Sequence, residues 1–286
     1  MSAYAREGDT VKELIDLDGL FDKKLSEFMQ ENAGKYTEKQ WESIIPKLYK
    51  SFGDTYVKKL GNTPRGYFAD IADGELVTLL ARYVEEDVPV PDFLCNELEL
   101  RSCPDALLTL LKSGNDALLT LAVNLAGGSP KAFGAYFELL SGELDPEIKD
   151  AIVDQLKSNA DAAKERAITC YEAGVERELM LEILSRCRER DDCILEILLK
   201  EFRTSEDDLP MHASYLAAYG DERALPVLLD FIDRDEINYL EYQELKYAIE
   251  ALGGEYTRPR DFSGDPYYQE ILSQSQMPTP EKNEVN

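Results

Sequence analysis

The only histidine of the chain is the first residue to consider as a catalytic base. His212 lies in the segment Leu-Pro-Met-His-Ala-Ser-Tyr, which begins at Leu209. A helix from Leu209 places His212 on the same face as Leu216 and Tyr219, which is typical of a histidine packed in a core. Ser214 is two residues away and points elsewhere on such a helix, so no serine–histidine pair forms locally. We predict no catalytic residue at this position.

The segment Gly61–Gly66 has the glycine spacing of a phosphate-binding loop. That loop requires a preceding strand and a following Lys-Ser/Thr pair, whose lysine reaches the phosphates. Here Tyr67 and Phe68 follow the second glycine, and no strand pattern precedes the first. We interpret the segment as a turn.

A calcium loop is suggested by Asp233, Asp235 and Glu244, which occupy its first, third and twelfth positions. The fifth and sixth positions, which require an oxygen ligand and a glycine, hold Ile237 and Asn238. We interpret this segment as the turn inside a helical hairpin. We predict no metal site and no cofactor for this chain.

Two acidic clusters, Glu85–Asp87 and Glu206–Asp208, are interpreted as solvated turns. Carboxylates from distant parts of the chain also have the chemistry for hydrolysis if the fold brings a pair together. An enzyme with a site assembled in that way stays an open alternative.

The five cysteines form no C-x-x-C pair and, with one histidine, provide no usual zinc ligand set. They are Cys95, Cys103, Cys170, Cys187 and Cys193. Free thiols in a reducing compartment are the simplest interpretation. A basic segment followed by an apolar one does not open the sequence, and no stretch has the roughly 20 apolar residues of a membrane span. We therefore expect a cytoplasmic protein.

The charge is strongly negative, because 57 acids against 31 bases give a net charge of −26. Residues 1–65 hold 11 of each sign, so the whole excess lies in residues 66–286. We find no basic stripe in the sequence, and nucleic-acid binding depends on lysine and arginine at phosphates. The sequence therefore predicts neither nucleic acid nor an anionic membrane as a partner. The charge serves solubility or attracts a basic protein.

Helical patterns recur about every thirty residues from position 74 onward. Residues Leu225, Leu228, Leu229 and Ile232 share one helical face, and a second apolar stripe runs through residues 237–252. First helices are expected to begin near Gly74, Pro104, Lys131, Asp161, Asp191 and Glu222, and second helices near Val90, Asn115, Asp145, Glu176, Asp208 and Ile237. Because one such hairpin cannot bury both of its stripes, neighbouring hairpins are required.

The segment Tyr219-Gly-Asp-Glu-Arg-Ala-Leu-Pro-x-Leu-Leu229, with Ala251-Leu-Gly253 closing the next helix, resembles a HEAT repeat of the short type common in bacteria. The resemblance is best over residues 209–254, weaker over residues 74–208 and absent from residues 1–70. It implies an all-α fold, an α-α superhelix (solenoid) of about six helical hairpins. HEAT-type proteins usually bind other proteins on a concave surface lined by the second helix of each pair.

The predicted domains are an N-terminal helical cap (1–70), the HEAT-like repeats (71–254), a C-terminal cap segment (255–272) and a disordered tail (273–286). In the N-terminal cap, Thr10 is expected to begin a helix that breaks at Asp18-Gly19. Thr37 and Gln40 form a capping box before a second helix with an aromatic stripe, which we expect to pack onto the first repeat.

Three functions are compatible with this fold. The first is a non-catalytic scaffold that binds another protein, and a basic protein is one option for that partner. The predicted contact residues are Gln243, Lys246, Tyr247 and Glu250, which point away from the buried stripe of the last second helix, with Tyr247 as the anchor. The second is an anionic decoy or chaperone for a basic protein, and the third is the enzyme considered above. The HEAT-like iron hydroxylases rely on repeated His-Glu pairs, which this chain lacks.

Overall fold

The structure is a computed structural model, and it describes residues 13–102, 105–204 and 208–275. Two units divide the chain, residues 1–155 and residues 156–286, and each is described by itself. Every element in the described residues is helical, and the only β feature among them is an isolated bridge between Val57 and Asn62. The expected all-α class is confirmed. None of the described helices combines the length and apolar character needed to cross a membrane.

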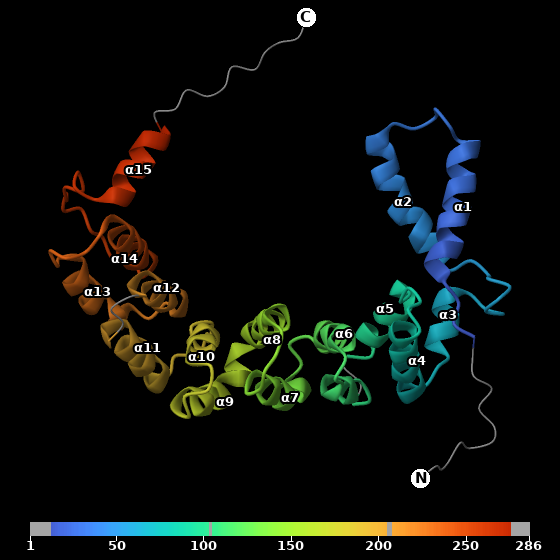
Figure 1. Ribbon diagram of the computed structural model, residues 1–286, viewed down its shortest axis with the longest axis horizontal. Helices are drawn as coiled ribbons and strands as arrows, with labels where there is room; N and C mark the ends of the chain where they lie inside the picture. Colours follow the sequence, from blue (N-terminus) through green and yellow to red (C-terminus); the bar gives the residue numbers. More distant parts are fainter. Residues whose placement is uncertain (1–12, 103–104, 205–207, 276–286) are drawn as a thin grey trace, which may run out of the picture. The chain divides into compact units, whose positions relative to one another are not determined.

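Unit 1 begins with two long helices and continues as pairs of shorter ones (Figure 1). Its elements are α1 (Leu17–Glu31), α2 (Glu38–Phe52), α3 (Pro64–Ala69), α4 (Asp73–Glu85), α5 (Asp92–Leu100), the 3₁₀ helix η1 (Leu107–Lys112), α6 (Asp116–Ala126) and α7 (Pro130–Leu140). Helix α8 (Pro146–Ser158) carries the chain across the unit boundary.

Unit 2 is a series of helical pairs followed by one short helix. Its elements are α9 (Ala160–Glu172), α10 (Arg177–Leu184), α11 (Asp192–Thr204), α12 (Leu209–Tyr219), the 3₁₀ helix η2 (Glu222–Ala224), α13 (Leu225–Ile232), α14 (Tyr239–Ala251) and α15 (Pro266–Ser275). Contacts join α9 to α10, α11 to α12 and α13 to α14, so each pair is a hairpin. The boundary between the units lies inside the region predicted as repeats.

The expected helix starts lie within two residues of an element start at eleven of the twelve positions, and at Glu222 that element is the 3₁₀ helix η2, which leads directly into α13. The twelfth, Pro104, lies outside the described residues. The helix that follows it, η1, is a six-residue 3₁₀ turn rather than the expected α-helix. The segment before α6 leaves no room for a longer helix, because Asn115 already caps α6. Its side chain accepts hydrogen bonds from the amides of Ala117 (3.0 Å) and Leu118 (3.2 Å).

The expectation for the first helix was wrong. Its predicted cap, Thr10, lies outside the described residues, and the helix begins at Leu17 and continues through Gly19 without a break. Asp16 is the N-cap, and its carboxylate accepts a hydrogen bond from the Gly19 amide at 2.7 Å. Ile15 precedes the helix because its carbonyl accepts a hydrogen bond from the buried Tyr83 hydroxyl (3.1 Å). Similarly, the tail predicted to be disordered overlaps α15 at residues 273–275, and residues 276–286 lie outside the described part.

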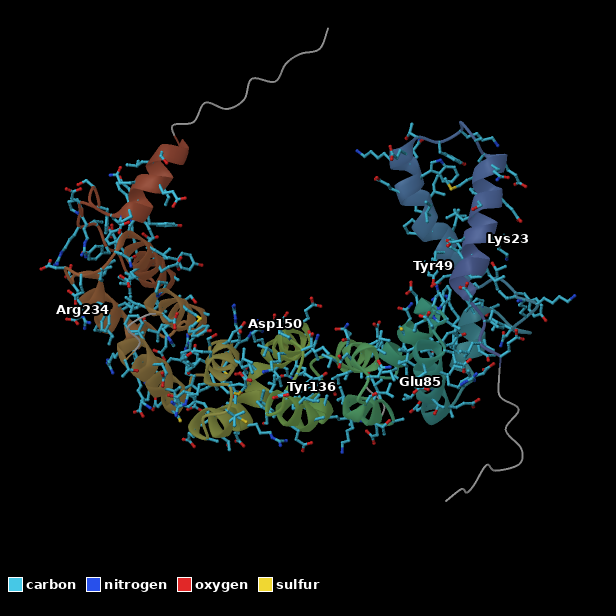
Figure 2. The ribbon with its side chains drawn as sticks, in the orientation of Figure 1. Lys23, Tyr49, Glu85, Tyr136, Asp150 and Arg234 are labelled. Carbon is cyan, nitrogen blue, oxygen red and sulfur yellow. The ribbon has the colours of Figure 1, made fainter. Side chains whose placement is uncertain are left out.

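The capping box predicted for the second helix is confirmed, since Thr37 and Gln40 exchange both hydrogen bonds at the start of α2. The aromatic stripe of α2 packs partly onto α5. Tyr49, labelled in Figure 2, stacks on Phe93 of α5 with ring centroids 4.9 Å apart. The ring of Trp41 meets the ring of Phe28 of α1 edge-on, with ring centroids 6.1 Å apart. At the end of this stripe, Tyr56 is 64% exposed.

Arg101 ties the end of α5 to the turn between α3 and α4. Its guanidinium donates to the carbonyls of Phe68 (3.2 Å), Ala69 (3.2 Å) and Ile71 (2.8 Å). The same side chain pairs with Asp73 at 2.7 Å and Glu97 at 2.8 Å. Because the carbonyls at a helix end have no partner within the helix, one arginine satisfies groups that would otherwise need water.

The C-terminal segment folds back onto the last helical pair. Arg258 pairs with Asp233 at 2.5 Å, and Arg260 donates to the carbonyl of Ile232 at 3.2 Å. Phe262 is buried and contacts Tyr242 of α14 with ring centroids 4.9 Å apart. These contacts hold residues 258–262 against the last helical pair.

We expect Arg101→Ala to lower the free energy of unfolding by about 2–4 kcal/mol, because several charge-assisted hydrogen bonds are lost and carbonyls are left unpaired. Urea unfolding followed by the fluorescence of Trp41, the only tryptophan, measures the change in unit 1. Lys131→Ala is the control, since the Lys131–Asp105 pair is exposed on both sides and should contribute about 0–1 kcal/mol. Equal losses in the two variants would contradict the structural role of Arg101.

A second prediction concerns Asp221, which is 5% exposed and follows α12. Hydrogen bonds from the Arg223 side chain (2.8 Å) and amide (3.0 Å) hold the pKa of Asp221 below its usual value. A carboxylate with a depressed folded-state pKa stabilises the fold above its unfolded pKa of about 3.9, and this contribution disappears as the pH falls through the folded value.

Asp221→Asn should therefore cost about 2 kcal/mol at pH 7, and the difference from the unchanged protein should shrink below pH 4. The midpoints of urea unfolding, followed by circular dichroism at pH 7 and at pH 3, measure this difference in stability. Asp230→Asn, in an exposed pair with Arg234 (3.4 Å), is the control with little expected effect. A difference that stays constant with pH would count against the assigned role.

Candidate protein-binding groove and arginine pocket

The second helices of unit 2 form a groove. Helix α12 packs against both α10 and α14. Between their exposed sides lies a depression of about 420 Å³, which we call the tyrosine groove. Its main lining side chains are Glu182, Ser185, Arg186, Ser214, Tyr215 and Tyr247.

Tyr247 is the predicted contact residue that lines this groove. Leu245 and Ile249 of α14 are fully buried, as expected, and Tyr247 is 63% exposed on the other side of the helix. The capping box of Asn238 and Glu241 fixes the first turn of α14 and therefore the direction of its faces. Tyr247 is therefore an exposed aromatic side chain on a helix whose opposite side is packed.

The other predicted contact residues surround Tyr247 on α14. Gln243 and Glu250 are exposed, and Lys246 is half-buried. Lys246 lies 3.9 Å from Glu250, one helical turn further on, so their charges partly compensate each other. None of these three lines the tyrosine groove. The structure therefore brings one of the four predicted residues, Tyr247, to the groove.

Tyr215 is the second aromatic side chain of the groove and comes from α12. It is half-buried, and burial, with added repulsion from Glu182 and Glu178, raises its pKa to about 12. Its hydroxyl is therefore neutral and able to donate a hydrogen bond at physiological pH. Its ring meets the ring of His212 edge-on at 5.8 Å.

The expectation that His212 is a packing residue agrees with its burial, since it is 4% exposed. Its Nε2 lies 3.9 Å from a carboxylate oxygen of Glu178. Ser214 donates to the carbonyl of Met211 at 2.7 Å and is turned away from His212. No serine–histidine pair forms at this position.

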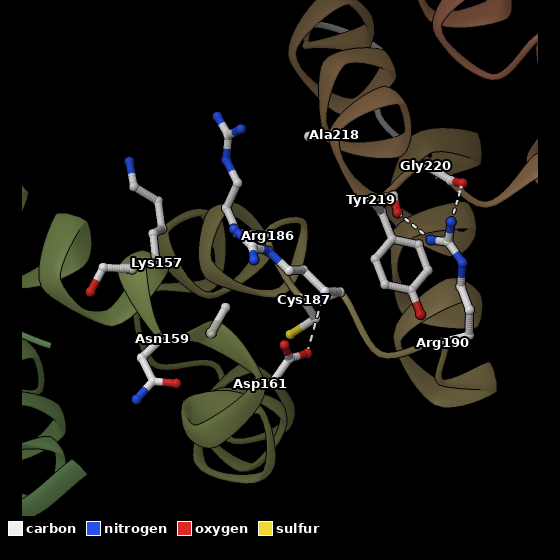
Figure 3. A pocket seen from close by; sticks show the side chains of 12 residues that line it. Lys157, Asn159, Asp161, Arg186, Cys187, Arg190, Ala218, Tyr219 and Gly220 are labelled. Atoms are coloured by element: carbon white, nitrogen blue, oxygen red, sulfur yellow. Dashed lines mark hydrogen bonds between the residues drawn. The ribbon is translucent and has the colours of Figure 1, made fainter. Parts of the chain in front are cut away.

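A second cavity of about 630 Å³ adjoins the groove and shares Arg186 and Ala218 with it. We call it the arginine pocket. It lies between the start of α9, the turn after α10 and the end of α12 (Figure 3). Its charged lining side chains are Lys157, Asp161, Arg186, Arg188 and Arg190. The expectation that the chain has no local basic cluster was wrong at this place.

The walls of the arginine pocket are held by hydrogen bonds between turns. Asp161 accepts from the amides of Arg188 (2.9 Å) and Glu189 (3.0 Å), which fixes the turn after α10 against the start of α9. Arg190 donates to the carbonyls of Tyr219 and Gly220 at the end of α12, as the dashed lines in Figure 3 show. The positive φ of Gly220 (72°) closes α12 in the left-handed conformation that glycine adopts without strain.

The cysteine in the arginine pocket is not a nucleophile at neutral pH. Cys187 is 2% exposed, and burial, together with Asp161, raises the pKa of its thiol to about 12. The thiolate is the reactive form of a cysteine, and because the pKa is raised, the population of thiolate at pH 7 is negligible. The pocket therefore offers charge and hydrogen-bond donors rather than covalent chemistry.

Each of the two loop motifs of the sequence is a turn that leads into a helix, α3 from Pro64 and α14 from Tyr239. In the segment Gly61–Gly66, Thr63 caps α3 and Arg65 pairs with Asp54 at 3.2 Å. In the calcium-like segment, Asp233 accepts a hydrogen bond from the Tyr256 hydroxyl at 2.7 Å. Within the described ranges, no group of three or more histidine, cysteine or acidic side chains is placed to hold a metal ion. In the acidic cluster Glu206–Asp208, residues 206 and 207 lie outside those ranges, and Cys103 does too.

Comparison of the chain with protein-family models, with curated proteins and with solved structures returned no match.

The arginine pocket is the feature that sequence reasoning missed. The signal was present as the alternation Arg186-Cys-Arg188-Glu-Arg190, which concentrates three guanidinium groups in five residues. Lys157, about thirty residues earlier, joins them only in the folded chain. Counting charges along the sequence hides such a site, because acids outnumber bases nearly two to one.

We expect alkylation by iodoacetamide at pH 8 to modify Cys193 first, because it is the exposed cysteine, and Cys187 last. Burial with a raised pKa leaves Cys187 little thiolate and little access. Peptide mass spectrometry over a time course measures the order, and the same reaction in urea should modify the two at similar rates. Rapid modification of Cys187 in the folded protein would contradict this description of the pocket.

Proposed function

We propose that the chain is a non-catalytic scaffold, an α-solenoid of HEAT-like hairpins, which binds a segment of another protein in the tyrosine groove. The observation that carries the proposal is Tyr247, a large aromatic side chain that lies exposed at the edge of a groove whose underlying helices are fully packed. Tyrosines are enriched among the side chains that dominate binding energy at protein interfaces.

The repeating hairpins support this function physically. Helices α10, α12 and α14 are held by buried stripes and by hydrogen bonds between turns, so the groove exists before a partner arrives. A preformed surface loses little conformational entropy on binding. The proposed cytoplasmic location is supported by the four described cysteines, which are free thiols.

The proposed partner segment places an apolar or aromatic side chain in the groove beside Tyr215 and Tyr247. The local charges favour this chemistry, because Glu182 is engaged by Lys157 at 2.5 Å and Lys246 lies next to Glu250. With Glu182 paired, the one unpaired charge that lines the groove is the guanidinium of Arg186, although residues 66–286 carry the whole net charge of −26.

The test uses a photo-crosslinking amino acid at position 247 to identify the partner and then purified components to measure affinity. We expect Tyr247→Ala to weaken binding about tenfold or more, which corresponds to losing an interface anchor. Tyr56→Ala is the matched control, because Tyr56 is equally exposed (64%) but lies in unit 1. Binding that is unchanged by Tyr247→Ala would reject the groove as the contact site.

The anionic decoy for a basic protein is the second candidate, and the net charge of −26 favours it. It places the contacts on dispersed carboxylates, so Tyr247→Ala would leave affinity intact while added salt would weaken binding steeply. A groove-bound partner shows the opposite pattern, with a large effect of the variant and a modest effect of salt.

A further inference from the structure

The carboxylates next to the arginine pocket are already engaged. Glu182 pairs with Lys157 at 2.5 Å. Glu189 and Asp191 pair with Lys164 at 3.2 Å and 3.6 Å. Asp161 accepts hydrogen bonds from two backbone amides. These bonds leave the nearby acids little capacity to neutralise the arginines of the pocket.

Two of the arginines have no partner. Arg190 is committed to the carbonyls at the end of α12, and it lies over the Tyr219 ring at 5.3 Å. In contrast, the side chains of Arg186 and Arg188 make no hydrogen bond or ion pair anywhere in the described part of the chain. Two free guanidinium groups therefore line one cavity of a protein in which acids exceed bases by 26.

From this arrangement we propose that the arginine pocket binds a phosphomonoester group. Arg186 and Arg188 line the same cavity, and both carry a full positive charge at neutral pH. Guanidinium groups donate paired hydrogen bonds that match the oxygens of a phosphate. Two unpaired arginines balance a group that carries nearly two negative charges, as a phosphomonoester does at pH 7, whereas a carboxylate would neutralise one of them.

The surroundings of the two arginines add to the same preference. The first turn of α9, a helix of 13 residues, lines the pocket, and the positive end of a helix dipole favours an anion. In Figure 3 the side chains of Lys157 and Arg186 extend in the same direction from neighbouring elements. A cavity of about 630 Å³ also has room for more than the phosphate itself, so the phosphate is carried on a larger molecule.

The kind of molecule that carries the phosphate can be inferred from the residues that line both cavities. Arg186 and Ala218 line both the arginine pocket and the tyrosine groove. A protein segment that places an aromatic or apolar side chain by Tyr247 can therefore present a phosphorylated side chain to Arg186 and Arg188. This part rests on the proposed function, while the phosphate site itself does not.

The first experiment tests the site without any partner. Phenyl phosphate is titrated into the isotopically labelled full chain, and the amide signals of Arg188, Glu189 and Gly220 are followed by NMR. We expect saturable shifts at pH 7.5 and an affinity about fivefold or more lower at pH 5, where the phosphate carries one charge. Phenylacetate, a carboxylate of similar size, should bind about tenfold more weakly.

Variants then assign the binding to the two free arginines. Arg186→Ala/Arg188→Ala should lower the affinity for phenyl phosphate at least tenfold. Arg166→Ala/Arg203→Ala is the matched control, because it removes two exposed arginines from α9 and α11 and should change affinity less than twofold. Circular dichroism of both double variants checks that they fold. Should phenyl phosphate cause no saturable shift, or bind equally to both double variants, the phosphate site is rejected.

The source of the phosphate is decided with the crosslinked partner. A loss of binding after phosphatase treatment of the partner supports a protein-borne phosphate. Unchanged partner binding, together with saturable phenyl phosphate binding, supports a free phosphate ester as the ligand. Tyr247→Ala should leave phenyl phosphate binding unchanged in either case, so failure of the tyrosine groove and failure of the arginine pocket are separate outcomes.

Discussion

Hydrogen bonds between the turns of successive helical pairs are the constraint on which the arrangement within each unit depends. In unit 1, Arg101 reaches carbonyls about thirty residues earlier. In unit 2, the Tyr219 hydroxyl donates to the carbonyl of Asp191 at 3.1 Å, and Arg223 pairs with Asp192 at 2.7 Å, again about thirty residues apart. Apolar stripes alone permit helices to slide, whereas a directional bond to a helix end permits one position. The period of about thirty residues is therefore a period of polar contacts as well as of apolar ones.

The same bonds create the candidate site. Asp161 and Arg190 fix three turns of unit 2 around one cavity, and the side chains of both are engaged in hydrogen bonds to backbone groups of those turns. Arg186 and Arg188 lie between these fixed points and remain without partners. The arginine that holds the end of α12 and the two that we propose to bind phosphate thus belong to one short turn, Arg186–Arg190. This division explains why a strongly acidic chain presents a cationic cavity.

The sequence predicted those features that depend on local pattern. Apolar spacing placed eleven of the twelve starts expected in the repeats within two residues. The Thr37–Gln40 capping box was recognisable because its two residues lie in one helical turn. The start of α1 was mistaken because Asp16 and Thr10 are both good caps, and the contact of Ile15 with Tyr83, 68 residues away, decides between them. The arginine pocket was missed for the same reason, since Lys157 and Arg186 converge only through tertiary contacts. Burial of Leu245 and Ile249 was predictable, whereas the groove beside Tyr247 required the neighbouring helix α12.

The net charge and the arginine pocket act on an anionic group in opposite directions, and both affect which ligand can bind. A field from a net charge of −26 repels an anion at distances up to the Debye length of about 8 Å, and it attracts a cationic protein over the same range. Inside the pocket, the unpaired guanidinium groups act at hydrogen-bond distance, where salt screens them less. A small free anion is repelled during its approach and is stabilised only after it has entered the pocket. On the proposed function, a phosphorylated side chain carried on a protein segment offsets that repulsion, because the segment also makes apolar contacts at Tyr215 and Tyr247, which depend little on salt.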